Sequence, residues 1–395
     1  MRAPFIALLI ALLLNCIVDF YIYTQLRRRC RCKKWSRLQL YTSILLIALM
    51  IVEIVLPARS GNRTSLLVKM WLLFAYLTAY IPKYIAIIFD LIGRLPVLWH
   101  HSRIKWLTPI GIGLGIVCFC TMWWGAIINR NNLDINEISV EIEGLPDSFD
   151  GFRIAQFSDL HTGTFGTDTA FVSRLVDRLN NLNADAIVFT GDIVNRQSDE
   201  IEPFLPVLKH IDAPYGTFAI LGNHDYGDYK NWESESDKRS NMQALYDSYS
   251  LTGIDLVLND HRWIHRGNDS IALIGVENIG EPPFHTYGSL TASYPDLSDD
   301  NVKILLSHNP RHWVDSIADN PAVNIPLTLS GHTHAMQIEI AGISPACLRY
   351  PTWGGMYHDT DGRHKLYVNI GSGTVGIPMR IGATPEITVF TLRKK

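Results

Sequence analysis

Nine residues decide the fold of this chain: Thr217-Phe218-Ala219-Ile220-Leu221-Gly222-Asn223-His224-Asp225. The first five have the composition of a buried strand, and the glycine after them permits a sharp turn. An amide, an imidazole and a carboxylate therefore arrive together at the end of a strand. Open α/β sheets bind their ligands at such strand ends.

Four other strand-like runs end in a similar way, with a small residue followed by side chains that can bind a metal. The runs and these side chains are 154–157 with Asp159 and His161, 186–190 with Asp192, 302–306 with His308, and 327–330 with His332 and His334. Between the runs, apolar residues recur at helical spacing, as at Phe171, Leu175 and Leu179. This alternation predicts an α/β sheet with helices on its faces, and the shared strand ends predict one site.

Charge divides the 395 residues into two unlike parts. Residues 1–132 carry sixteen Lys and Arg against three acidic residues, which are Asp19, Glu53 and Asp90. Because the whole chain has 35 basic and 38 acidic side chains, the remainder has 19 basic and 35 acidic ones and a net charge near −16. A nucleic-acid groove needs a basic surface that faces the phosphates, so we expect no nucleic-acid partner.

The basic part contains four long apolar runs, at about 5–26, 38–56, 66–92 and 107–128. Each reaches the ~19 to 20 residues that a helix needs to cross the hydrocarbon layer, so we expect a transmembrane region over residues 1–128. Buried helices of a soluble all-α domain are an alternative, but amphipathic spacing is missing. The first run could also be a cleaved signal peptide, but it continues past Cys16.

The loops between these runs indicate an orientation. The first and third loops, 27–37 and 94–105, carry seven and three basic residues, whereas the second carries Arg59 and Arg63. The positive-inside rule then places the first and third loops in the cytoplasm. Both termini, and the part after residue 128, are expected on the extracytoplasmic side.

A short polar segment, 129–137, is expected to be a linker. After it, residues 138–142 alternate apolar and polar side chains, which is typical of a half-exposed strand. We therefore expect the second domain to extend over 138–395.

The side chains at the strand ends point to metal chemistry. Asp159 and His161 are two residues apart, so on an extended segment both can grip one cation, and His332 with His334 repeats the pattern. Asp, Asn and His without thiolate suit Mn, Fe or Zn and disfavour a structural zinc site. Two cations about 3.5 to 4 Å apart can hold a hydroxide and clamp a phosphoryl group, so the reaction expected is phosphoester hydrolysis.

These motifs resemble the ordered signature of the calcineurin-like metallophosphoesterases. The similarity extends from about residue 138 to the C-terminus and includes an ending similar to the membrane-associated bacterial branch with YkuE- and YaeI-type phosphodiesterases. It implies a four-layer α/β/β/α sandwich and says nothing about the four apolar runs before it. From those runs we expect four transmembrane helices ahead of the sandwich, in a bacterial inner or cell membrane. The resemblance also implies two divalent metal ions. One would be held by Asp159, His161, Asp192 and His334, and the other by Asp192, Asn223, His308 and His332.

The resemblance leaves His224 outside the metal set. In the family this histidine donates a proton to the leaving oxygen, and we expect Asp225 to orient it. The segment 226–241 with Tyr229 and the loop 345–365 with Trp353 could form rims around the site.

Tethering beside a bilayer raises the local concentration of lipid phosphates. We therefore expect a membrane-anchored hydrolase of phosphodiester, pyrophosphate or phosphomonoester bonds in a lipid or lipid-linked substrate. The alternatives are a protein phosphatase, a nucleotide-sugar-lipid pyrophosphatase on the same fold, and a non-catalytic membrane sensor.

Overall fold

The computed structural model describes residues 2–29, 33–55, 61, 63–282 and 284–395. Contacts divide the chain into two units: a helical unit of residues 1–58 and 68–126, and a sandwich unit of residues 59–67 and 127–395. Leu56, at the end of the second expected helix, and Arg59, in the loop after it, lie outside the described residues.

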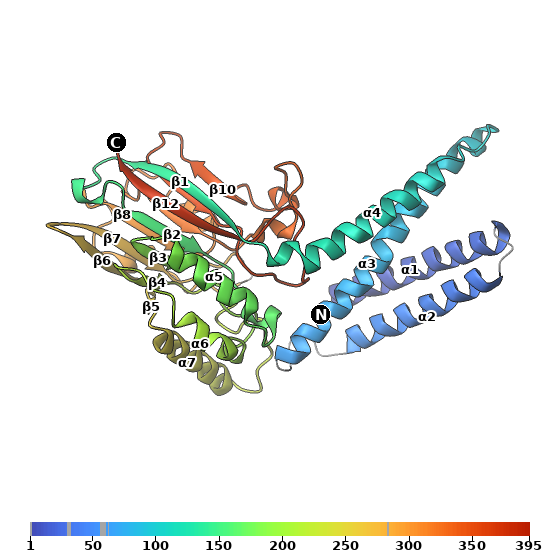
Figure 1. The fold of residues 1–395 in the computed structure, drawn as a ribbon, viewed down its shortest axis with the longest axis horizontal. Helices are drawn as coiled ribbons and strands as arrows, with labels where there is room; N and C mark the ends of the chain where they lie inside the picture. The colour runs from blue at the N-terminus through green and yellow to red at the C-terminus, as the bar shows by residue number, and fades with distance from the viewer. Residues whose placement is uncertain (1, 30–32, 56–60, 62, 283) are drawn as a thin grey trace. The chain divides into compact units, whose positions relative to one another are not determined.

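Four long helices form the helical unit, apart from the first turn of the third (Figure 1). They are α1 (Arg2–Arg29), α2 (Lys33–Val55), α3 (Arg63–Arg94) and α4 (Leu107–Ile127). Each contains a stretch long and apolar enough to cross a membrane, so the prediction of four transmembrane helices is confirmed.

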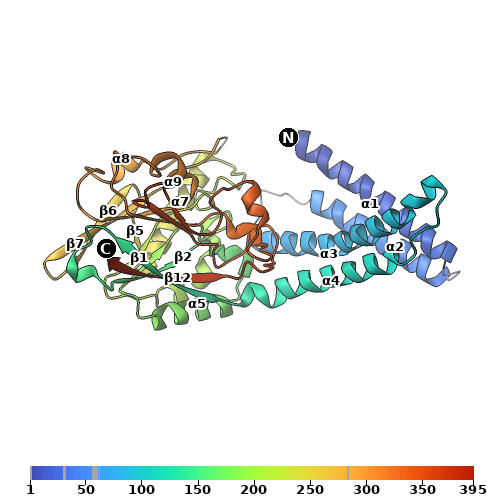
Figure 2. The same ribbon diagram turned by 90° about the horizontal axis from the view of Figure 1, so that it is seen from above.

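Glycines let α3 and α4 lie side by side (Figure 2). A Cβ atom at Gly111 would lie 2.4 Å from the Cβ atom of Phe89, and one at Gly115 would lie 2.8 Å from the carbonyl oxygen of Pro82. Small residues of this kind let two helix backbones approach closely within a bilayer.

The sandwich unit contains two six-stranded sheets, ordered β1-β12-β2-β3-β4-β5 and β10-β11-β9-β8-β7-β6. The first consists of β1 (Asp134–Ile142), β2 (Arg153–Phe157), β3 (Ala186–Phe189), β4 (Thr217–Ala219), β5 (Asp255–Leu256) and β12 (Glu386–Lys394). The second consists of β6 (Asp260–Arg266), β7 (Asp269–Val276), β8 (Lys303–Ser307), β9 (Leu327–Ser330), β10 (Gly355–His358) and β11 (Lys365–Val368). Strands β2, β3 and β4 are parallel, as are β8 and β9, so in each sheet their carboxyl ends share one edge.

Helices cover the outer face of each sheet, and those on the first sheet can be seen in Figure 1. They are α5 (Ala170–Asn181), α6 (Leu205–Leu208) and α7 (Glu235–Thr252) on the first sheet, and α8 (Leu290–Ser293) and α9 (Arg311–Ser316) on the second. The inner faces pack against each other through buried side chains such as Val188 and Phe218 of the first sheet and Leu273 and Ile304 of the second. The predicted four-layer α/β/β/α sandwich is confirmed.

Strand β1 begins earlier than the sequence indicated. It pairs in parallel with β12 from Asp134 opposite Glu386 to Ile142 opposite Lys394, so residues 134–137 of the expected linker 129–137 are strand. The first residues of β1 are largely exposed, and hydrophobic alternation could not reveal them. Backbone pairing with a strand some 250 residues away in the sequence, rather than side-chain burial, extends β1 at this end.

Candidate metal centre

The expected ligands lie where the central strands of both sheets end. Asp159 and His161 follow β2, and Asp192 follows β3. His308 follows β8, while His332 and His334 follow β9. Asn223 follows the strand-like run that begins with β4. The structure therefore brings all seven expected metal ligands to one place, and five of them are buried: Asp159, His161, Asp192, His308 and His334.

Several of these side chains stand on left-handed backbone, which residues other than glycine seldom adopt. The φ angle is 52° at Asp159, 48° at His161, 63° at Asp192, 78° at His332 and 51° at His334. Each such position costs of order 1 kcal/mol or more, and such positions cluster at functional sites. The strained turns aim the side chains inward from the strand ends.

Two glycines make room for the carboxylates. A Cβ atom at Gly222 would lie 2.2 Å from Oδ1 of Asp192, and one at Gly331 would lie 2.3 Å from Oδ2 of Asp159. Any larger residue at either position would displace a carboxylate. The glycine in each motif is therefore required by close approach.

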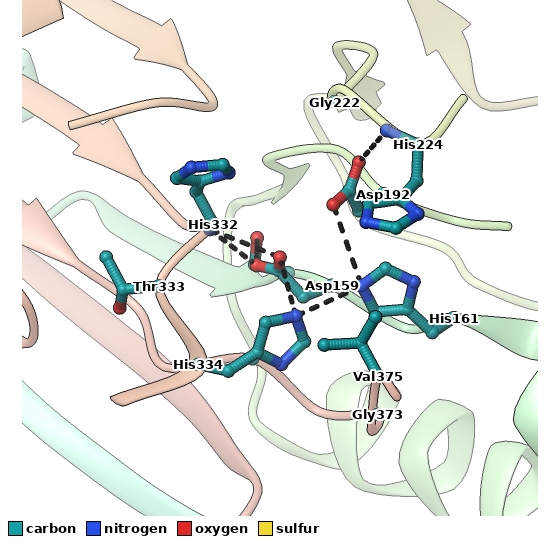
Figure 3. A network of polar contacts seen from close by, with 12 residues as sticks. Asp159, His161, Asp192, Gly222, His224, His332, Thr333, His334, Gly373 and Val375 are labelled. Atoms are coloured by element: carbon teal, nitrogen blue, oxygen red, sulfur yellow. Dashed lines mark hydrogen bonds and ion pairs between the residues drawn. The ribbon is translucent and has the colours of Figure 1, made fainter. Parts of the chain in front are cut away.

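Asp159, His161 and His334 form the first ligand group (Figure 3). Nε2 of His334 lies 3.2 Å from Oδ1 of Asp159 and 3.0 Å from Nε2 of His161. The ligand atoms of the three residues all lie within 4.8 Å of one another, so together they could hold one cation.

A second ligand group lies beside the first and shares Asp159 with it, namely Asp159, Asp192 and His308. Nε2 of His308 lies 3.2 Å from Oδ2 of Asp192 and 3.1 Å from Oδ1 of Asn223. The same oxygen of Asn223 lies 2.8 Å from Nδ1 of His332, which brings both residues into this group.

Backbone hydrogen bonds at Nδ1 of His161 and His308 indicate that the other ring nitrogen, Nε2, points its lone pair into the candidate metal centre. Nδ1 of His161 lies 3.1 Å from the carbonyl oxygen of Val194, and Nδ1 of His308 lies 2.7 Å from that of Thr190. A carbonyl oxygen only accepts, so each Nδ1 carries the hydrogen and, in a neutral ring, Nε2 presents a lone pair. Both lone pairs face Oδ2 of Asp192. A cation stabilises such an arrangement, so the residues present fit a bound metal.

The pKa values of the centre follow from burial and the facing charges. Burial alone would lower the pKa of His308, but the Asp192 carboxylate raises it to about 9. Burial would raise the pKa of Asp192, yet the neighbouring imidazoles hold it well below its ordinary value. Burial and the nearby His308 lower the pKa of His332 to about 3. A positive charge between Asp192 and His308, either a proton or a cation, is therefore favoured.

His224 lies next to both groups without belonging to either. Its backbone N–H donates to Oδ1 of Asp192 over 2.8 Å, and its ring Nδ1 lies 2.7 Å from the carbonyl oxygen of Asn195. The ring also stacks on Tyr229 with 4.1 Å between centroids, and the side chain is partly exposed. Asn195 and Tyr229 thus fix the orientation of an imidazole that a ligand can reach.

Asp225 does not orient the His224 ring, which differs from the sequence expectation. One carboxylate oxygen accepts from the backbone N–H groups of Asp192 and Gly222, both over 2.8 Å, and the other accepts from Ile193 over 2.9 Å. The buried carboxylate therefore braces the turn that carries Asp192. Adjacency in the sequence suggested the wrong partner because the strand-end turn directs the two side chains to different neighbours.

Three further residues that the sequence did not single out support the centre. The fully buried Arg380 donates to the carbonyl oxygens of Gly373 and Ile370, and its Nη2 lies 3.2 Å from Nδ1 of His334. Glu200 accepts from the backbone N–H of Asn195 over 2.5 Å. The Tyr350 hydroxyl lies 3.3 Å from Nε2 of His332, so the predicted rim 345–365 reaches the site through Tyr350.

Comparison with known proteins agrees with this geometry. The family described as "Calcineurin-like phosphoesterase" matches residues 152–336, and that described as "Probable Calcineurin-like phosphoesterase, transmembrane domain" matches residues 1–130. YkuE of Bacillus subtilis (strain 168), an uncharacterized metallophosphoesterase, is 32% identical over 272 residues, which cover 66% of this chain and 86% of YkuE. The chain belongs to the calcineurin-like metallophosphoesterases. The phosphoesterase is therefore a metal-dependent hydrolase of phosphoric esters, as the resemblance implied, and it has the four membrane helices that the apolar runs predicted.

Two other similarities have lower sequence identity. The "Transmembrane protein with metallophosphoesterase domain" of Danio rerio is 29% identical to the phosphoesterase over 265 residues, covering 65% of this chain and 57% of that protein. Among solved structures, the sulfate thiohydrolase SoxB of Thermus thermophilus is 12% identical with a TM-score of 0.36, covering 63% of this chain and 57% of that chain.

Proposed function

We propose that this phosphoesterase uses two divalent cations, Mn, Fe or Zn, to hydrolyse a phosphate ester of a lipid or lipid-linked substrate. One observation supports the use of two cations rather than one. Oδ2 of Asp192 lies 3.6 Å from Nε2 of His161 and 3.2 Å from Nε2 of His308, so a single oxygen reaches both sets of imidazoles. A carboxylate in that position can bridge two cations.

Seven side chains would hold the two cations. The first cation would be bound by Asp159, His161, Asp192 and His334, and the second by Asp192, Asn223, His308 and His332. When bound, the cations supply a nucleophile at neutral pH and positive charge that balances the phosphoryl oxygens. The chain contributes rigid ligands, since backbone carbonyls hold the rings of His161 and His308.

His224 serves as the proton donor to the leaving oxygen. The carbonyl oxygen of Asn195 accepts its Nδ1 hydrogen, so the proton that passes to the leaving oxygen as the phosphorus–oxygen bond breaks is the second one, which Nε2 carries in the imidazolium form of the ring. His224→Ala is therefore expected to lower kcat on a soluble aryl phosphodiester by about 10² to 10⁴-fold while the metal content stays unchanged. His210→Ala, at an exposed histidine without an assigned role, is the control. Loss of metal from the His224 variant would mean that this role is wrong.

Exposed apolar side chains beside the site support a lipid substrate. Ile340, Ile343 and Leu348 are 66%, 68% and 89% exposed, and all three follow closely after His334. A backbone bridge between Ile340 and Ile343 presents these two together. Exposed apolar groups that gather in one place mark contact surfaces, and for a chain with four membrane helices the surface at hand is a bilayer.

The lipid part is tested by comparing two substrates. Ile340→Ser combined with Ile343→Ser is expected to lower hydrolysis of a phospholipid in vesicles about tenfold and to leave the rate on the soluble aryl phosphodiester unchanged. Leu251→Ser, at a 70% exposed leucine on α7, is the matched control. If both substrates respond equally, or neither responds, the substrate is not taken from a bilayer.

The loop charges support an extracytoplasmic position for the catalytic domain. An alkaline phosphatase fusion at Lys395 is then expected to be active. An inactive fusion, together with a fluorescent-protein fusion that glows at the same residue, would place the domain in the cytoplasm instead.

A further inference from the structure

The helical unit contains a cavity of about 830 Å³. Side chains of all four helices line it, among them Tyr21 and Gln25 of α1, Gln39 of α2, Lys83 of α3, and Ile116 and Phe119 of α4. Ligand pockets in proteins typically measure about 300 to 1,000 Å³, so the cavity is large enough for part of a lipid.

The cavity has polar side chains at one end and an apolar wall along α4. Asp90 and Thr108 line it where α3 ends and α4 begins, whereas Ile112, Ile116 and Phe119 continue it along α4. From Thr108 to Phe119 a helix rises about 16 Å, which is roughly half of the ~30 Å hydrocarbon layer. The cavity thus has the dimensions of one leaflet and the polarity of an amphipathic ligand.

Next to the polar end, just behind the lining residues Asp90 and Thr108, lies a surplus of positive charge. The Asp90 carboxylate forms ion pairs with two guanidinium groups, one on Arg94 at 2.9 Å and one on Arg103. These three side chains together have a net charge of +1. In addition, Nε of Arg103 is buried and has no hydrogen-bond partner among the described residues. An anion at this end would balance the charge.

The other ion pair beside the cavity is already balanced. The Asp19 carboxylate accepts from Nζ of Lys83 over 2.8 Å, from the Tyr80 hydroxyl over 2.7 Å and from Nε2 of Gln39 over 3.0 Å. One carboxylate and one ammonium cancel, so this pair needs no further charge. Of the two ion-paired groups described at the cavity, it is therefore the one at the Asp90 end that has uncompensated charge.

We propose that the cavity binds one anionic phospholipid. Its phosphate lies against Arg94 and Arg103, and an acyl chain extends past Ile112 toward Phe119. Basic pockets between transmembrane helices on the cytoplasmic side are suited to anionic head groups. Arg94 donates to Gln25 of α1, and the exposed Arg27 and Arg28 follow Gln25 on the same helix. The phospholipid completes the charge balance and fills apolar space that side chains leave open.

This lipid is distinct from a substrate held for hydrolysis. Thr108 lies in the first turn of α4, and the chain leaves the helical unit after Ala126, in the last turn of α4. The 21 residues of α4 rise about 30 Å, so the phosphate site and the exit of the chain lie at opposite ends of this helix. The inference therefore stands whether or not the proposed substrate is right.

Lipid retention by the full chain tests the proposal. The protein is purified in detergent, delipidated, and titrated with phosphatidylglycerol or with phosphatidylcholine of identical acyl chains, and bound lipid is counted by native mass spectrometry. We expect one phosphatidylglycerol per chain, bound about fivefold to tenfold more tightly than phosphatidylcholine. Equal binding of the two lipids would overturn the proposal.

Two variants separate head-group recognition from cavity volume. Arg103→Gln is expected to reduce the preference for phosphatidylglycerol to twofold or less, whereas Ala86→Phe, which fills the cavity, weakens binding of both lipids about tenfold. Arg37→Gln removes an exposed cation of α2 and is the matched control, whereas Arg103 pairs with Asp90, which lines the cavity. If Ala86→Phe fails to fold, the Arg103 and Arg37 variants still test whether the site recognises the anionic head group. Unchanged phosphatidylglycerol binding by Arg103→Gln, or an equal loss in the Arg37 variant, would contradict the proposed site.

Discussion

Both units contain buried carboxylates, and the two units balance them in different ways. In the helical unit the chain supplies its own cations, since Asp19 pairs with Lys83 and Asp90 pairs with Arg94 and Arg103. In the hydrocarbon layer an unpaired carboxylate is costly, and the bilayer offers no soluble cation to balance it.

The sandwich unit leaves its central carboxylates to imidazoles and backbone N–H groups. Among the described residues, no Lys or Arg side chain lies within ion-pair distance of Asp159 or Asp192. The lone pairs of His161 and His308 point toward Asp192 as well, which adds to the negative potential. The comparison teaches that buried carboxylates faced by converging imidazoles, rather than by the chain's own Lys or Arg, have the pattern of a metal site.

The largest effect is expected at the carboxylate that joins the two ligand groups. Asp192→Ala should lower kcat on a soluble aryl phosphodiester by on the order of 10³-fold or more, because both cations lose a ligand. Elemental analysis of the same protein should find fewer than two cations per chain. Asp247→Ala, at an exposed aspartate of α7, is the control. A variant at Asp192 that hydrolyses as fast as the parent would break the comparison, since that carboxylate would then need no cation.

A smaller effect is expected from unbalancing the helical unit. Lys83→Met leaves the Asp19 carboxylate buried without its cation and should destabilise the unit by about 3 kcal/mol, measured by thermal unfolding in detergent. Adding Asp19→Asn should restore most of the loss, because the double variant has no uncompensated charge. If the single variant unfolds like the parent, the pair is not what stabilises the carboxylate.

The smallest effect concerns Glu200, which braces the Asn195 segment beside His224. Burial raises the pKa of Glu200 to about 7 from an ordinary value of 4.5. The folded chain then holds a proton that the unfolded chain has lost, so this stability contribution is complete below pH 4.5 and disappears as the pH rises to 7. Relative to Glu200→Gln, the parent should lose roughly 1 to 2 kcal/mol of unfolding free energy between pH 5 and pH 8.

Glu202→Gln is the matched control for that series, because Glu202 is exposed in the same segment. Parallel pH profiles for the parent and Glu200→Gln would show that the carboxyl does not bind a proton on folding. For the sandwich unit, the comparison of how buried carboxylates are compensated would then rest on the carboxylates of the metal centre.

Much of the fold was readable from local patterns. Apolar runs of transmembrane length and strand-like runs that end in a small residue before a polar side chain are properties of short segments, so the four helices and the strands that carry the ligands could be predicted. The first residues of β1 were not predicted as strand, because they are held by pairing with β12, which no local pattern reveals.

The sequence by itself determined the chemical inventory of this protein: the two unlike parts, the membrane spans and the set of Asp, Asn and His side chains. Only the tertiary structure decided which of them meet. It turned Asp225 toward the backbone of Asp192 instead of the His224 ring, and it placed the carbonyl oxygen of Asn195 against that ring. It also left an amphipathic cavity among four helices that each look like a simple anchor. The physical reason is that partner choice depends on close packing between segments far apart in the chain, whereas residue type and periodicity are local.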